Sequence, residues 1–143
     1  MQQISKQAIV DFPAMDMYNL VDDIAAYPEF LPWCAKSTIQ ERSDDQVVAS
    51  IVLKKGLINQ TFTTRNTLQE ATRIEMNLVD GPFSELHGVW QFKELSERSC
   101  KISLEMEFTI SNPVLRLTLE PVFSQVLGRL VEAFKDRAEE IYG

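Results

Sequence analysis

The side chains that could support acid–base or metal chemistry are few and scattered along this sequence. The only histidine, His87, lies between Leu86 and Gly88 in an alternating segment, whose apolar side chains share the opposite face. This alternation directs the imidazole outward, away from any interior position where a general base would act. Cys34 and Cys100 lack the spacing of a zinc site, and no glycine-rich phosphate loop is present. The sequence therefore predicts no catalytic residue and no metal site, and indicates a protein that is not an enzyme.

Two polar side chains fall on the apolar face of a predicted strand. If Phe62 points inward, the alternation of a strand also directs Thr64, Asn66 and Leu68 inward. A buried hydroxyl and a buried amide need hydrogen-bond partners. Either these groups bond to one another, to the backbone or to water, or they line a cavity and orient the polar head of a ligand.

A local basic segment is the second candidate for binding chemistry. From Gln46 to Gln69 there is no Asp or Glu, yet Lys54, Lys55 and Arg65 are present, in a chain of formal net charge −7. These residues are either a solvated edge whose lysines discourage edge-to-edge pairing, or a contact for an anion. The anion would be RNA phosphate or an acidic lipid head group.

Large apolar side chains are held in a proline-rich loop around residues 27–34, which can form only a short helical turn. This loop either plugs one end of the core or forms the lip of a cavity and a contact patch. A second break, Asp80-Gly81-Pro82, is a turn after which an aromatic side chain could cover the open end. The residues predicted at the lip are Phe30, Leu31, Trp33 and Phe83.

The elements that must position these groups are mostly strands. Residues 3–12 alternate as a strand, and Pro13 opens a helix over roughly 13–23. Six further strands are predicted at 35–43, 46–55, 57–69, 72–79, 86–95 and 100–111. The last of these alternates most cleanly, with one apolar and one polar face, as expected for an antiparallel sheet packed on one side.

The last thirty residues carry one broad apolar stripe at helical spacing. Its members are Val114, Leu115, Leu119, Val122, Phe123, Val126, Leu127, Leu130, Phe134, Ala138 and Ile141. Pro121 interrupts the pattern, which predicts a short segment at 113–119, a kink or restart at Pro121, and a main helix to about Tyr142.

Seven strands closed by one long apolar helix indicate an α+β fold, in which a curved antiparallel sheet wraps around the helix. Such an arrangement tends to leave a cavity between the sheet and the helix. The residues predicted to line it are Phe62, Thr64, Asn66, Met76, Leu78, Trp90, Phe92, Ile102, Leu104, Met106, Val126, Leu130 and Phe134.

Length and composition limit the function classes. The 143 residues, 45% of them hydrophobic and 24% charged, predict one domain over 1–143 with a full core. The net charge of −7 argues against extensive binding along a phosphate backbone. The N-terminus has no apolar signal segment, and no apolar run approaches the ~20 residues that a spanning helix needs. We therefore expect a cytoplasmic protein with no DNA partner, which could touch a membrane surface transiently. We expect Cys34 and Cys100 to be reduced, with a disulfide between them as the alternative.

Several segments, in the same order along nearly the whole chain, resemble the RatA / coenzyme Q-binding family of START-like, polyketide cyclase-like proteins. They are Tyr18-Asn19-Leu20-Val21-Asp22-Asp23-Ile24, Tyr27-Pro28-Glu29-Phe30-Leu31-Pro32-Trp33-Cys34, Phe62-Thr63-Thr64-Arg65-Asn66, Met76-Asn77-Leu78-Val79-Asp80-Gly81-Pro82-Phe83 and Val122-Phe123 with Phe134 and Arg137-Ala138. The blocks around Tyr27 and Asp80 are specific in combination, whereas either one alone would be weak.

The resemblance implies a helix-grip fold with a hydrophobic cavity in place of a catalytic site. Mitochondrial relatives are regarded as ubiquinone-binding proteins that support respiration. Bacterial RatA is described as a toxin that associates with the large ribosomal subunit and blocks joining of the small one. The resemblance thus implies no required cofactor, with ubiquinone or another isoprenoid or lipid as a possible bound molecule.

Three functions follow as hypotheses. The first is a RatA-type protein that binds a hydrophobic ligand and the large ribosomal subunit. Its contact with the subunit would use Lys54, Lys55 and Arg65 together with the Pro28–Trp33 loop. The second is a ubiquinone or lipid carrier, or chaperone, that supports respiration without a ribosomal role. The third is an enzyme of the polyketide cyclase/dehydratase type, which the lack of an interior acid–base pair disfavours.

Overall fold

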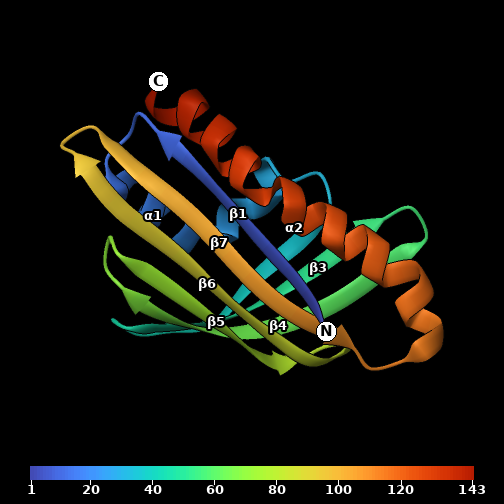
Figure 1. The fold of residues 1–143 in the computed structure, drawn as a ribbon. Helices are drawn as coiled ribbons and strands as arrows, with labels where there is room; N and C mark the ends of the chain where they lie inside the picture. Colours follow the sequence, from blue (N-terminus) through green and yellow to red (C-terminus); the bar gives the residue numbers. More distant parts are fainter.

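The fold is a curved antiparallel sheet that holds a long C-terminal helix, as Figure 1 shows for the computed structural model of residues 1–143. The strands are β1 (Gln2–Val10), β2 (Cys34–Arg42), β3 (Gln46–Lys55), β4 (Ile58–Gln69), β5 (Arg73–Asp80), β6 (Phe83–Ser96) and β7 (Ser99–Ile110). The helices are α1 (Ala14–Asp22), the 3-10 helix η1 (Ile24–Glu29) and α2 (Pro113–Tyr142). The predicted α+β helix-grip architecture is confirmed.

The order of strands in the sheet explains its shape. The seven strands lie in the order β1-β7-β6-β5-β4-β3-β2, and every neighbouring pair is antiparallel. Strands β2 to β7 follow one another as hairpins, whereas β1 pairs with β7 at the far edge. The two short helices therefore carry the chain from one edge of the sheet to the other, across one end of the core.

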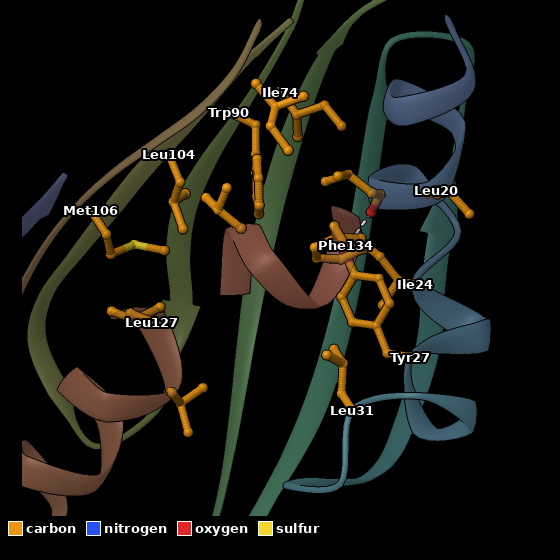
Figure 2. Close-up of a cluster of buried hydrophobic side chains, with 14 of the residues drawn as sticks. Leu20, Ile24, Tyr27, Leu31, Ile74, Trp90, Leu104, Met106, Leu127 and Phe134 are labelled. Atoms are coloured by element: carbon orange, nitrogen blue, oxygen red, sulfur yellow. Dashed lines mark hydrogen bonds between the residues drawn. The ribbon is translucent and has the colours of Figure 1, made fainter. Parts of the chain in front are cut away.

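The core lies between the concave face of the sheet and α2. Along β7, Ile102, Leu104, Phe108 and Ile110 are fully buried, which confirms the predicted alternation of this strand. Figure 2 shows Trp90 and Met106 of the sheet and Leu127 of α2 pointing into the same interior space as Tyr27 of η1. Burial of these large side chains is the main source of stability.

Strand β6 begins at Phe83, earlier than the predicted start at residue 86. The cause is a register shift between Phe83 and Glu85, which leaves Ser84 as the extra residue of a bulge opposite β7. Phe83 and Leu86 are therefore both buried although their odd spacing breaks the period of two. A pattern of strict alternation could not detect this part of the strand.

The expected restart of the C-terminal helix at Pro121 is wrong. One unbroken helix runs from Pro113 to Tyr142, and Asn112 caps it by accepting hydrogen bonds from the N–H groups of Val114 (2.8 Å) and Leu115 (3.1 Å). Pro121 removes the N–H that would bond to the carbonyl of Leu117. Because both residues are on the exposed side of the helix, water can satisfy that carbonyl and the helix continues.

The predicted apolar stripe of α2 is also too long. Its two ends, Val114 and Ile141, are 76% and 48% exposed, while Val131, which the pattern omitted, is buried. Helical spacing alone therefore overestimates the contact between α2 and the sheet. No helix of the structure is long and apolar enough to span a bilayer.

Candidate ligand cavity and its mouth

An apolar cavity lies between α2, η1 and the concave face of the sheet. Of the residues predicted to line it, the structure places eight there: Phe62, Thr64, Asn66, Met76, Trp90, Met106, Val126 and Leu130. The wall also contains residues that the sequence analysis did not assign to it: Ile24, Tyr27, Trp33, Ala49, Ile51, Leu86, Phe123 and Leu127. The free volume is about 60 Å³, enough for a few water molecules.

The other predicted lining residues pack elsewhere in the structure. Phe92, Ile102, Leu104 and Phe134 are almost fully buried in the hydrophobic core, and Leu78 is a half-buried side chain at its edge. The alternation correctly gave their inward direction. It could not distinguish the part of the concave face that α2 covers tightly from the part that it leaves open.

The two polar groups of the interior are paired with each other. The Thr64 hydroxyl donates to Asn66 Oδ1 across 2.9 Å, and both side chains are buried. In this arrangement the Asn66 amide N–H groups donate no hydrogen bond within the protein. The pair can therefore be both a satisfied core contact and a donor to a ligand oxygen.

The floor of the cavity depends on a glycine. A Cβ on Gly88 of β6 would lie 2.6 Å from Met106 Sδ and 2.8 Å from Met76 Cε. Only glycine lets both methionine side chains lie across the backbone here. Methionine is flexible and polarisable, so this floor can adapt to the shape of an apolar molecule.

The cavity and a groove on the surface share three lining residues, Trp33, Val126 and Leu130. The groove has a volume of about 330 Å³ and also includes Lys55 and Arg129. We call the three shared residues the cavity mouth. The Trp33 carbonyl accepts a hydrogen bond of 2.8 Å from the Lys54 N–H, which fixes the loop to the end of β3.

The predicted lip residues have different positions. Trp33 lies at the cavity mouth, and Leu31 is buried beneath the surface groove. Phe30 packs edge-on against Tyr27 and Phe134. Phe83 belongs to an aromatic cluster with Phe62, Phe108 and Phe123.

The three predicted basic contact residues do not form one cluster. Lys54 and Lys55 lie together at the end of β3, where Lys55 Nζ donates to Gln125 Oε1 of α2 across 2.8 Å. Arg65 is opposite Val48, six residues along the ladder from Lys54, or roughly 20 Å at the rise of a strand. Lys54 and Arg65 share the outer face of the sheet, whereas Lys55 points towards α2.

Four side chains that can gain or lose a proton are of interest here: His87, Cys34, Cys100 and Tyr27. His87 is exposed, as expected, and its Nε2 lies 3.3 Å from Glu75 Oε2 on the outer face. Both cysteines are free and buried, and burial raises the pKa of each thiol to about 11. The buried Tyr27 hydroxyl donates to the Val21 carbonyl, and desolvation raises the pKa of this phenol above its ordinary value.

Comparison with known proteins agrees with this architecture. A family model described as polyketide cyclase / dehydrase and lipid transport matches residues 10–135. The ribosome association toxin RatA of Pseudomonas aeruginosa is 46% identical over 140 residues, which cover 98% of this chain and 97% of that protein. The chain belongs to the RatA family, within this larger family. RatA of Escherichia coli K12 is 43% identical, with 99% of this chain and 90% of that protein covered.

More distant relatives show how widely the RatA fold is used. A mitochondrial coenzyme Q-binding protein of Dictyostelium discoideum is 26% identical over 92% of this chain and 66% of that protein. The crystal structure of the Zhui aromatase/cyclase of Streptomyces sp. R1128 has a TM-score of 0.85 at 19% identity, covering 96% of this chain and 93% of that one. A START superfamily protein of Mycobacterium smegmatis has a TM-score of 0.81 at 20% identity, covering 97% and 98%. At such identities the last two establish the fold alone.

Proposed function

We propose that this RatA-family protein associates with the large ribosomal subunit, hinders joining of the small subunit and catalyses no reaction. The observation that carries the proposal is 46% identity to a ribosome association toxin over nearly the full length of both chains. The cavity supports the non-catalytic part, because no carboxylate or imidazole lines it. We further propose that residues 1–143 act as one domain in the cytoplasm.

The proposed ribosomal contact is the end of β3 together with the adjacent loop. Lys54 and Lys55 are exposed there, and the loop with Pro32 and Trp33 lies beside them. Arg65 would be a separate contact on the outer face. Because the whole chain has a net charge of −7, the footprint on RNA must be small.

A charge reversal tests this contact. The double variant Lys54→Glu, Lys55→Glu should lose co-sedimentation with the large subunit. Lys93→Glu, Lys101→Glu is the matched control, because these two lysines face each other across β6 and β7 far from the proposed contact. Retained co-sedimentation of the Lys54/Lys55 variant, with no dependence on salt, would refute the contact.

The apolar cavity favours a second candidate function, the binding of an isoprenoid quinone or another apolar lipid. The supporting observation is the Thr64–Asn66 pair, which offers amide donors to a carbonyl oxygen in an otherwise apolar wall. The coenzyme Q-binding relative supports the same ligand class. At about 60 Å³ the cavity must widen to admit a quinone ring, and the methionine floor is the part best able to move.

Leu130→Glu tests ligand binding. Leu130 is half-buried at the cavity mouth, so a carboxylate there can reach water without unfolding the protein, yet it blocks an apolar chain. Ile141→Glu, on an exposed position of the same helix, is the control. Native mass spectrometry with solvent extraction should recover a quinone or lipid from wild type and control only. Equal recovery from Leu130→Glu would rule out this ligand path.

A further inference from the structure

Three aliphatic side chains are exposed at one end of the molecule, and packing within the protein does not account for apolar residues at these positions. Leu57, at the tip of the β3–β4 hairpin, is fully exposed, and Val114 and Leu117, in the first turns of α2, are 76% and 78% exposed. We call these three residues the aliphatic tip. Exposed large apolar groups that gather in one region mark an interaction surface.

The core does not need these side chains. In α2, Leu119 is buried and Leu115 is half-buried, so the inward face of its first turns is already apolar. Val114 and Leu117 are three residues apart and therefore neighbours on the outward face. Leu57 follows Gly56, whose φ of +61° makes the tight turn that projects the next side chain outward.

Both parts of the aliphatic tip lie at the end of the molecule where the cavity mouth opens. Figure 1 shows the β3–β4 hairpin and the first turns of α2 at the same end of the sheet, away from the C-terminus. The hydrogen bond from Lys55 to Gln125 ties the hairpin to α2. Gln125 precedes Val126 of the cavity mouth and is roughly 12 Å along the helix from Leu117.

Basic residues lie next to the aliphatic tip in the sequence. Lys54 and Lys55 immediately precede the Gly56 turn. Arg116 lies between Val114 and Leu117, but its guanidinium donates to the Ile110 carbonyl from Nε (3.3 Å) and Nη2 (3.0 Å) and so lies against the end of β7. Between residues 113 and 125 the only acidic side chain is Glu120, which is half-buried. The β3–β4 hairpin is thus locally basic in a chain of net charge −7, and basic residues beside an exposed leucine suit an anionic lipid surface.

We propose that the aliphatic tip docks on an anionic lipid bilayer, with Leu57, Val114 and Leu117 inserted among the lipids and Lys54 and Lys55 against the head groups. The inference rests on the second candidate function, because docking of this end brings the cavity mouth to the membrane, where an apolar ligand can enter or leave. The contact is a reversible surface attachment by three side chains.

Vesicle co-sedimentation of the purified protein tests the proposal. The wild type should bind vesicles of phosphatidylglycerol and phosphatidylcholine at low salt, and should not bind pure phosphatidylcholine vesicles. Leu57→Ser with Leu117→Ser should weaken binding at least about tenfold, since two leucines lose their transfer to the lipid phase. Leu95→Ser is the matched control, because Leu95 is 48% exposed near the β6–β7 turn. Lys54→Gln with Lys55→Gln should weaken binding by roughly thirtyfold.

Three outcomes would overturn membrane docking. One is a wild type that does not bind the anionic vesicles. Another is equal binding by the Leu57→Ser, Leu117→Ser variant, or an equal loss in Leu95→Ser. The third is loss of ribosomal co-sedimentation in the aliphatic variant with unchanged vesicle binding, which would assign the surface to the ribosome. If the wild type binds vesicles but yields no quinone or lipid on extraction, the ligand function is rejected and the docking surface is retained.

Discussion

Gly88 is the residue on which the shape of the cavity floor depends most directly. Gly88→Ala should push the ends of the Met76 and Met106 side chains into the cavity, because its Cβ would meet them at less than 3 Å. We expect the free energy of unfolding to fall by about 1 kcal/mol, since overpacking strains flexible side chains only mildly. The affinity for an apolar fluorescent probe, measured by titration, should fall by a larger factor than the stability does.

Gly128→Ala is the matched control for this substitution. Its Cβ would approach nothing closer than Lys6 Cε at 4.0 Å, and alanine favours a helix over glycine. This variant should therefore gain stability and keep the probe affinity. Unchanged probe affinity in Gly88→Ala would show that the methionine floor does not limit the cavity.

Because two thiols are buried, the stability of the protein should fall at alkaline pH. The pKa of Cys34 and Cys100 is raised from 9.0 to about 11 by burial, so the unfolded chain loses these protons first. Their contribution is complete below about pH 9 and is lost as the pH rises towards about 11. Urea unfolding of the wild type should show a steeper fall in stability over this range than Cys34→Ala, Cys100→Ala. Equal slopes would contradict the assignment.

Single residues also show what a sequence can reveal about a site. Alternation placed Thr64, Asn66, Trp90 and Met106 on the inner face, where the structure has them. It could not show that the two polar groups bond to each other, because that depends on side-chain geometry within one strand. It also could not find Ile24 and Tyr27. These two residues reach the cavity from η1, in the segment that carries the chain from one edge of the sheet to the other.

At the scale of elements, α2 tolerates a proline that should have divided it. Pro121→Ala restores a backbone donor for the Leu117 carbonyl, so we expect the free energy of unfolding to rise by about 1 kcal/mol. Pro113→Ala is the control, because proline at the first helical position costs little. A loss of stability in Pro121→Ala, measured by urea unfolding, would show that the proline shapes the helix to fit the sheet.

The predicted elements agree with the structure wherever a single period dominates. Strand β3 has the expected bounds, and β7 differs from them by one residue at each end. The differences arise where a bulge or a long-range contact overrides local pattern, as at Phe83 and along the outer turns of α2. These features depend on neighbouring strands and on solvent, which a linear pattern does not contain.

At the scale of the whole molecule, charge and apolar surface are distributed unevenly. The acidic chain has a locally basic β3–β4 hairpin, which carries Lys54 and Lys55 and lies at the same end as the aliphatic tip and the cavity mouth. From composition alone we predicted that the protein does not bind RNA over a large surface. The clustering of these features at one end required the fold, because the β3–β4 hairpin and α2 are far apart in sequence.

Sucrose-gradient sedimentation of isolated ribosomal subunits with the purified protein tests the central claim most directly. The account predicts that the protein migrates with the large subunit and lowers the amount of joined particles, and that Lys54→Glu with Lys55→Glu abolishes both effects. A protein that stays at the top of the gradient at low salt, with subunit joining unchanged, would contradict it.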